Sequence, residues 1–386
     1  ELTKSLIVDN GHAIYICPTR FLKRDYGKAL RHFIRQNLAL VEIVDFGDKQ
    51  NFENAMTYTG IFMFRASNDS DNNIEYKQGL EESPVIFSPN KLNQEVWNFS
   101  MSNNDDLLEK IQHEKKYLID LCDGIYQGIA TGKDNVFLVD GNIILGHDIE
   151  RGILRPFLKG KNIRPYTIEW GGLYLIYPYD ENGNVISEQF FKSHYPNAYQ
   201  YMLDNKDNLK GRSYFDKSSK AWYELWNQRK PTRFEGEKIV TLDNASCNSF
   251  ALDINGFFGT TTVYSLKIIS DDGLNNKYVL GVLNSKLLNY YHRNTSVPQA
   301  GGFFRYQALF IKNLPIASAN ETIVNRISKC VTEILLGKKQ NADTTSLENQ
   351  IDFLVYHLYG LTYDEVLKVD PETPISREEY EAYKEE

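Results

Sequence analysis

Residues 124–165 constrain the fold more than any other part of the sequence. Short apolar runs at 125–129, 136–139 and 142–145 alternate with glycine and asparagine, which is typical of short strands joined by turns. We expect a tight hairpin at Asp140-Gly141, between the second and third runs, because both central residues of such a turn take positive φ. The stretch therefore predicts a β-rich platform.

The second half of this platform is cationic. Residues 151–164 carry five basic side chains and no acidic one, and residues 273–320 also hold no acid. Residues 205–234 interleave basic side chains with Tyr214, Phe215, Trp222, Tyr223 and Trp226. Lys and Arg bind phosphate, and exposed rings stack on bases, so these segments favour a nucleic-acid contact over the alternative of a solvated surface. The basic candidates are Lys133, Arg155, Lys159, Lys161, Arg164, Arg212, Arg229, Arg233, Arg293 and Arg305.

The net charge of the whole chain does not favour a nucleic-acid partner. The formal net charge of the 386 residues is −8, which taken alone argues against a polyanionic partner. The acidic side chains are concentrated in residues 69–123 and 343–386. Because local fields steer ligands, this partition matters more than the sum.

The first 65 residues predict a strand–helix–strand unit. We expect strands at 13–17, 40–46 and 58–64 and a helix at 25–36. Such a unit is typical of a parallel sheet with helices on both faces, but three strands are too few to bury such a sheet. Because the sequence also begins at Glu1 without an initiator Met, we interpret this part as the tail of a doubly wound, Rossmann-like sheet whose first strands lie upstream.

Phe52 stands in the loop between the second and third of these strands. If that loop lies at the carboxyl edge of the sheet, it is where doubly wound folds bind ligands. An aromatic ring there can stack on a base extruded from a duplex. The pattern equally allows an ordinary core phenylalanine.

The rest of the chain is expected to be mixed. Strands are expected at 173–177, 238–242, 250–253 and 261–268, and helices at 105–121 and 279–292. After residue 320 the chain is expected to be helical, with capping boxes at Thr345/Glu348 and Thr362/Glu365 and a C-cap at Gly360. The fold class is therefore α/β followed by α+β, with boundaries at residues 1–85 (tail of the sheet), 86–123 (connecting helix region), 124–317 (β-rich domain) and 318–386 (C-terminal helices).

Several kinds of site are not indicated. The four cysteines form no C-x-x-C pair and the seven histidines do not cluster at ligand spacing, so neither a metal nor a disulfide framework is expected. Scattered cysteines fit a reducing, cytoplasmic setting. The sequence has no apolar run long enough to span a bilayer and no signal peptide, so no membrane partner is expected.

Several segments resemble a known family. Four segments resemble, in this order, the second half of the catalytic domain of gamma-class adenine-N6 DNA methyltransferases: GHAIYICPTRFLKRDYGKALRHFIRQN, LVEIVDF, NF and TYTGIFMF. GIYQGIATGKDNVFLV, LRPFLKGKNIRPY, WNQRKPTRFEGEKIV, VLGVLNSKLLNYY and GGFFRYQALFIKNLPI resemble the TaqI-like C-terminal target-recognition domain. IDFLVYHLYGLTYDEV resembles the closing helices of the fused Type IIG restriction–modification enzymes.

This resemblance implies a partner, a cofactor and site residues. The complete enzyme would bind double-stranded DNA, flip one adenine and methylate its N6 from S-adenosylmethionine, and Mg²⁺ would be needed only by a fused nuclease. Phe52 matches the aromatic residue that stacks on the flipped adenine, and the Lys159-Gly160-Lys161-Asn162 turn with Arg164 matches the part of the recognition domain that faces DNA. The glycine-rich cofactor loop and the Asn-Pro-Pro-Tyr motif of the family are not in this sequence. We therefore expect no catalytic residue in this chain, no activity from the chain alone, and a catalytic half upstream as its partner.

Two other hypotheses remain open. The chain is alternatively a stand-alone DNA-specificity module that positions a separate catalytic subunit. It is also compatible with a protein-interaction scaffold whose basic segments are merely solvated.

Overall fold

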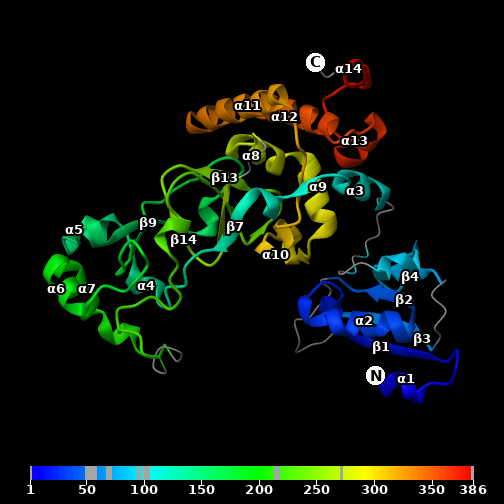
Figure 1. Ribbon diagram of the computed structural model, residues 1–386, viewed down its shortest axis with the longest axis horizontal. Helices are drawn as coiled ribbons and strands as arrows, with labels where there is room; N and C mark the ends of the chain where they lie inside the picture. Colours follow the sequence, from blue (N-terminus) through cyan, green and yellow to red (C-terminus); the bar gives the residue numbers. More distant parts are fainter. Residues whose placement is uncertain are drawn as a thin grey trace. The chain divides into compact units, whose positions relative to one another are not determined.

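The described residues form two compact units. The computed structural model describes residues 2–47, 59–66, 72–93, 97, 99, 105–212, 218–269 and 273–383. The first unit comprises Glu1–Lys110 and Val297–Gly302, and the second comprises Ile111–Ser296 and Phe303–Glu386 (Figure 1).

The first unit is built on a five-stranded sheet with the strand order β1-β3-β2-β4-β5. The expected strands and helix of the first 65 residues are confirmed, with shifts of at most a few residues at their ends. The elements are α1 (Leu2–Leu6), β1 (His12–Pro18), α2 (Lys28–Asn37), β2 (Ala39–Asp45), β3 (Thr59–Arg65), β4 (Ile74–Lys77) and β5 (Val85–Phe87).

The expectation of a parallel sheet is wrong for most of these strands. β1 and β2 run in the same direction but do not pair, because β3 lies between them and is antiparallel to both. Only β2 and β4 pair in parallel. A place between two strands suits β3, because its sequence TGIFMFR is apolar on both faces and gains from cover on two sides. Phe62 is fully buried there.

β1 lies at one edge of this sheet and is unusually exposed. Its exposed fractions are 59% at Ile14, 47% at Tyr15 and 51% at Ile16, so large apolar side chains face outward on both sides of the strand. Among the described residues β1 pairs only with β3. Phe52 lies outside the described residues.

The centre of the second unit is an antiparallel sheet with the order β13-β11-β15-β7. Two helices that meet at Ser285 pack beside it, where the sequence predicted one helix at 279–292. The side chain of Asn284 ties the first of these helices to β13 through the backbone N–H and C=O of Phe250. The bounds are β7 (Cys122–Gln127), β11 (Lys238–Leu242), β13 (Phe250–Asp253), β15 (Val263–Ile268), α8 (Asn276–Asn284) and α9 (Lys286–Thr295).

A second sheet, with the order β14-β9-β10-β8, forms a lobe with four helices (green in Figure 1). The expected hairpin at Asp140-Gly141 is wrong. Asp140 instead caps a helix, and its carboxylate accepts the backbone N–H groups of Asn142 and Ile143, which is the usual role of Asp at such a position. The bounds are α4 (Asp134–Phe137), β8 (Leu138–Val139), α5 (Gly141–Gly146), β9 (Leu154–Leu158), β10 (Tyr174–Ile176), α6 (Glu188–His194), α7 (Pro196–Asp204) and β14 (Phe258–Gly259).

The remaining elements are short strands and helices of the second unit, together with α3, most of which belongs to the first unit. The helix expected at 105–121 ends at Gln112. The chain then forms the short strand β6, which pairs antiparallel with β18. The remaining bounds are α3 (Asp105–Gln112), β6 (Lys116–Tyr117), β12 (Asn244–Ala245), β17 (Phe303–Arg305), α10 (Ala308–Ile311), β18 (Pro315–Ile316), α11 (Glu321–Lys339), α12 (Thr345–Leu358), α13 (Tyr363–Val369) and α14 (Arg377–Ala382).

The helical C-terminal part is confirmed. Thr362 and Glu365 form the expected capping box, and Gly360 takes the left-handed conformation with φ 66°. The other expected box is one residue out of place, because Thr344 rather than Thr345 precedes α12 and bonds Glu348. None of the helices described is both long and apolar enough to cross a bilayer.

Candidate nucleic-acid interface

The loop that carries Lys133 is shaped by its neighbours. Gly132 has a φ of 80°, and a β-carbon there would lie 3.1 Å from the Trp226 Cβ, so glycine is required for both reasons. The backbone N–H of Trp226 donates to the Thr131 carbonyl (3.2 Å), and that of Asn227 donates to the Ala130 carbonyl (2.9 Å). This pairing holds Lys133 near Trp226, whose side chain is 46% exposed.

The turn at 159–162 lies next to this loop. The Lys159 Nζ is 3.9 Å from the Asp134 carboxylate. Asn162 organises the turn, because its side-chain oxygen accepts the Lys159 N–H (2.8 Å) and its amide nitrogen donates to the Glu169 carbonyl (2.8 Å). Lys161 is exposed at the tip, and the half-exposed Arg164 lies 3.4 Å from the Glu169 carboxylate.

Backbone contacts connect this turn to β17. A β-carbon at Gly160 would lie 3.3 Å from the Thr262 Oγ1, and the Thr262 carbonyl accepts the Asp243 N–H (2.9 Å). The Asp243 carboxylate is 3.3 Å from the Arg305 guanidinium. The Arg293 guanidinium stacks at 4.6 Å over the ring of Phe304, the residue before Arg305 in β17. We call Lys133, Lys159, Lys161, Arg293 and Arg305 the basic track.

A buried histidine holds Arg305 in place. His292 is fully buried, and its Nε2 lies 2.9 Å from the Arg305 carbonyl, so this nitrogen carries the proton and donates. The Ser296 hydroxyl donates to the same carbonyl (2.7 Å). Burial lowers the pKa of His292 to about 4, because desolvation disfavours the imidazolium.

We expect His292 to make the protein sensitive to acid. Its pKa is lower in the folded state than the ordinary value, so the unfolded chain binds more protons and stability is lost as the pH falls from about 6.5 towards about 4. The loss is about 3 kcal/mol when complete. In urea titrations, His292→Gln should be less stable than the parent at pH 8 and should lose less stability on acidification to pH 4.5.

At each pH, the quantity compared is the difference in unfolding free energy between variant and parent. This removes the contribution of the buried Asp352, whose pKa is raised to about 7 and which shifts stability with pH in the opposite direction. His113→Gln is the matched control, since His113 is exposed. Equal acid sensitivity of His292→Gln and parent would assign the effect to other groups.

Arg229 and Arg233 form a second cationic pair. The Arg233 guanidinium stacks over the Tyr126 ring at 4.6 Å. Burial, and then the charge of Arg233, lowers the pKa of Arg229. Within the described residues neither guanidinium forms an ion pair with a carboxylate. Two neighbouring cations without such a partner attract an anion, because it relieves their mutual repulsion.

Two of the sequence candidates lie elsewhere. Arg212 is only 6% exposed, and its guanidinium donates to the carbonyls of Leu209, Glu224 and Trp222. Its fork of donors therefore holds the interior of the lobe together, which gives Arg212 a structural role. Arg155 lies in β9, donates to the Gly152 carbonyl (2.9 Å) and lines a pocket of the lobe.

The sequence pattern did not separate the aromatic candidates of residues 205–234, of which Tyr214 and Phe215 lie outside the described residues. Of the described three, Tyr223 is buried, Trp222 bonds Glu188, and Trp226 is the most exposed. It also missed Thr262 and Asp243, which join Lys159 to Arg305. No local signal was available for them, because they lie in turns at the ends of β11 and β15, far from Lys159 in the sequence.

Two families match parts of the chain. Residues 155–316 match the TaqI-like C-terminal specificity domain, and residues 1–52 match the Eco57I restriction-modification methylase. Four of the five basic-track residues fall within the first match. Lys133 precedes it.

Known proteins resemble almost the whole chain. The Type II methyltransferase M.BstVI of Geobacillus stearothermophilus is 22% identical over 389 residues, which cover 94% of this chain and 66% of the relative. The Type II methyltransferase M.MjaIV of Methanocaldococcus jannaschii is 28% identical over 236 residues, or 59% of this chain and 76% of the relative. The Type IIL restriction-modification enzyme MmeI, solved in complex with DNA, has a similar fold (TM-score 0.62, 10% identity), over 98% of this chain and 51% of MmeI.

The chain therefore spans about two thirds of the length of M.BstVI and about half of MmeI. The family matches and the relatives agree with the resemblance of the individual segments. The chain resembles Type II methyltransferases, and its residues 155–316 match the TaqI-like C-terminal specificity domain.

Proposed function

We propose that this chain is the DNA-recognition part of a restriction–modification adenine-N6 DNA methyltransferase. The observation that carries the proposal is the basic track. A chain of net charge −8 carries Lys133, Lys159 and Lys161 on two neighbouring loops, Arg293 on α9 and Arg305 on β17. Neighbouring cations bind the phosphates of a DNA backbone. The exposed Trp226 near Lys133 offers an aromatic ring on which a base can stack.

Salt-titrated binding to duplex DNA tests this proposal. If the five track residues each neutralise a phosphate, the logarithm of the affinity should fall with the logarithm of the salt concentration with a slope of about −4 to −5. Asn162 and Arg164 support the turn of the track, and Arg229 and Arg233 are proposed as further contacts. Affinity that does not change with salt would favour the protein-interaction scaffold instead.

The first unit is proposed to be the end of the catalytic sheet. β1 exposes Ile14, Tyr15 and Ile16 on both of its faces, and such an edge is a liability unless another strand or helix covers it. This supports a division into residues 1–85 as that sheet, 86–123 as a connection, 124–317 as the recognition domain and 318–386 as a helical end. It also favours a fused enzyme over the alternative, a stand-alone specificity module.

The methyl donor is proposed to bind outside this chain. β1 leads through Pro18 into a short 3-10 helix at Thr19–Leu22, and no glycine-rich turn into a helix N-terminus follows it. The residues described do not fit S-adenosylmethionine, so no step of methyl transfer is assigned to them. We propose that the isolated chain binds DNA and does not transfer methyl groups, and that Mg²⁺ is required only if a nuclease is fused upstream.

Phe52 is proposed to stack on the flipped adenine. In the full-length enzyme, Phe52→Ala should slow methylation about ten- to a hundredfold, because stacking on an aromatic ring contributes about 1–3 kcal/mol per base. DNA affinity should change less. The measurement is single-turnover transfer of a labelled methyl group, and Phe52→Tyr is the control that keeps the ring. An unchanged methylation rate in Phe52→Ala would contradict the proposal and favour the alternative, an ordinary core phenylalanine.

A further inference from the structure

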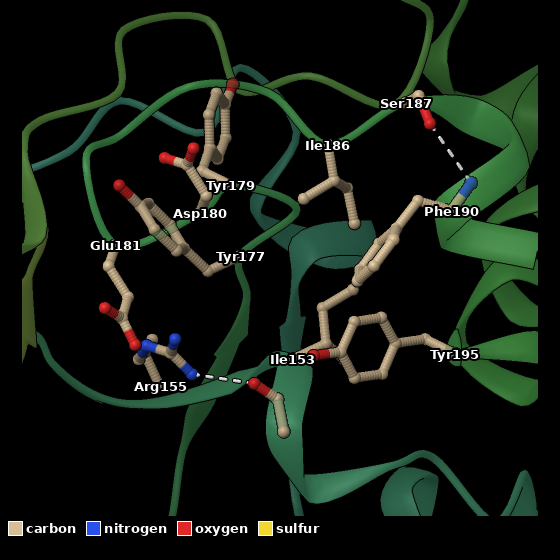
Figure 2. A pocket seen from close by; sticks show the side chains of 11 residues that line it. Ile153, Arg155, Tyr177, Tyr179, Asp180, Glu181, Ile186, Ser187, Phe190 and Tyr195 are labelled. Carbon is tan, nitrogen blue, oxygen red and sulfur yellow. Dashed lines mark hydrogen bonds between the residues drawn. The ribbon is translucent and has the colours of Figure 1, made fainter. Parts of the chain in front are cut away.

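The lobe contains a pocket that the basic track does not use. Its volume is about 530 Å³, and it opens between the start of β9, the loop after β10 and α6 (Figure 2). Pockets that bind small organic ligands measure about 300–1,000 Å³ and combine apolar walls with a few polar groups. This pocket has both kinds of wall.

One wall is apolar. Figure 2 shows Ile186, Phe190 and Tyr195 on one side of the pocket. The rings of Phe190 and Tyr195 lie 6.3 Å apart between centroids at 65°. Phe190 remains 39% exposed in spite of its size. A planar ligand beside these side chains would remove apolar surface from water.

The other wall offers donors and acceptors. Arg155, Tyr177 and Glu181 lie on this side (Figure 2). Arg155 donates to carbonyls through Nη1 only, which leaves its remaining N–H groups for a ligand within the described part of the chain. Glu181 has neither a hydrogen bond nor an ion pair among the described residues.

The polar wall is held rigidly. Asp180 accepts the backbone N–H groups of Asn182 (2.9 Å) and Asn184 (2.8 Å), which fixes the turn that carries Glu181. These hydrogen bonds lower the pKa of Asp180. The Tyr177 hydroxyl donates to the Arg229 carbonyl (2.7 Å), so its ring is fixed as well.

One segment connects the pocket to the basic track. On the pocket side, the Tyr223 hydroxyl donates to the Ile186 carbonyl (2.8 Å) and Gln228 donates to the Gly183 carbonyl (3.0 Å). On the track side, Trp226 and Asn227 of the same segment pair with the Lys133 loop. Residues 223–229 therefore join the two sites.

We infer that this pocket binds a nucleobase of the guanine type. Guanine presents two adjacent N–H donors beside a carbonyl oxygen, which match the paired acceptors of the Glu181 carboxylate and the donors of Arg155. Two carboxylates at the rim repel a phosphate, so the base and not the backbone enters. The base has two conceivable sources: a nucleotide extruded from the DNA duplex and a free nucleoside. The first source rests on the proposed DNA-binding function, and the second does not.

Calorimetric titration of the whole chain with guanosine tests the pocket directly. Saturable binding is expected, at least tenfold weaker for adenosine, whose exocyclic amine offers one donor position to the carboxylate. Glu181→Gln should weaken guanosine binding at least tenfold. Phe190→Ala should weaken the binding of both guanosine and adenosine. Glu235→Gln, at another exposed carboxylate, is the matched control. Absent guanosine binding, or binding unchanged in Glu181→Gln, overturns the inference.

Selection from a random pool of duplexes then identifies the source of the base. If the base is extruded from DNA, Glu181→Gln relaxes the preference at one guanine position and guanosine competes with the duplex. If the source is a free nucleoside, the selected sequence is unchanged. A pool in which no duplex is bound contradicts the proposed function, whereas the guanosine titration still decides the pocket.

Discussion

Neutralising three lysines of the basic track is expected to lower the affinity for duplex DNA about 100-fold at 0.2 M salt. The variant is Lys133→Gln/Lys159→Gln/Lys161→Gln. Each lost phosphate contact removes about 0.9 from the slope of affinity against salt, so the slope should become shallower by about 3 and the loss should grow at lower salt. The measurement is fluorescence anisotropy with a labelled duplex from 0.05 to 0.3 M salt.

A matched triple variant controls for total charge. Lys329, Lys339 and Lys368 are exposed on α11 and α13, and their replacement by glutamine changes the net charge by the same amount. The control should keep the parental slope. If the two triple variants lose affinity equally, long-range charge and not the track controls binding.

Breaking the buried ion pair between Lys238 and Asp253 should cost about 3–5 kcal/mol of unfolding free energy. Both side chains are fully buried at paired positions of β11 and β13. Asp253 also accepts the backbone N–H groups of Asn255 (2.8 Å) and Phe257 (2.9 Å). Asp253→Asn leaves the Lys238 ammonium buried without its counter-ion, and urea unfolding at pH 7 measures the loss.

The double variant Lys238→Met/Asp253→Asn isolates the cause. It removes both charges. Both variants keep a side-chain oxygen for only one of the two backbone N–H groups, so this loss is the same in each. Replacing a buried pair by uncharged side chains is often close to neutral, so the double variant should recover most of the stability lost in Asp253→Asn. An equal loss in both would locate the cost in packing around Asp253 and not in the unpaired ammonium.

Local signals predicted many elements correctly. The strand and helix of the first unit follow from hydrophobic periodicity, and Thr362 with Glu365 forms its capping box because both residues lie in one helical turn. Asp140-Gly141 was ambiguous, since the same dipeptide suits a hairpin and a helix N-terminus. The surrounding packing decided it: Val136 and Phe137 belong to a helix in the core of the lobe, which leaves no partner strand for residues 142–145.

Charge patterning identified the basic segments but not the roles of their members. Arg212 and Lys161 look alike in the sequence, yet Arg212 is buried against three carbonyls and Lys161 is exposed on a turn. Which cation reaches solvent depends on neighbours from distant segments.

The sequence alone determined many of the helices and strands, the separation of acidic from basic segments, and the resemblance to restriction–modification methyltransferases, because each of these depends on residues that are near one another in the chain. The tertiary structure alone decided the order β1-β3-β2, the track from Lys133 to Arg305 and the pocket around Arg155 and Glu181. These depend on contacts between residues that are far apart in the chain, in some cases by about a hundred positions. Local propensity carries no information on which distant residues pair.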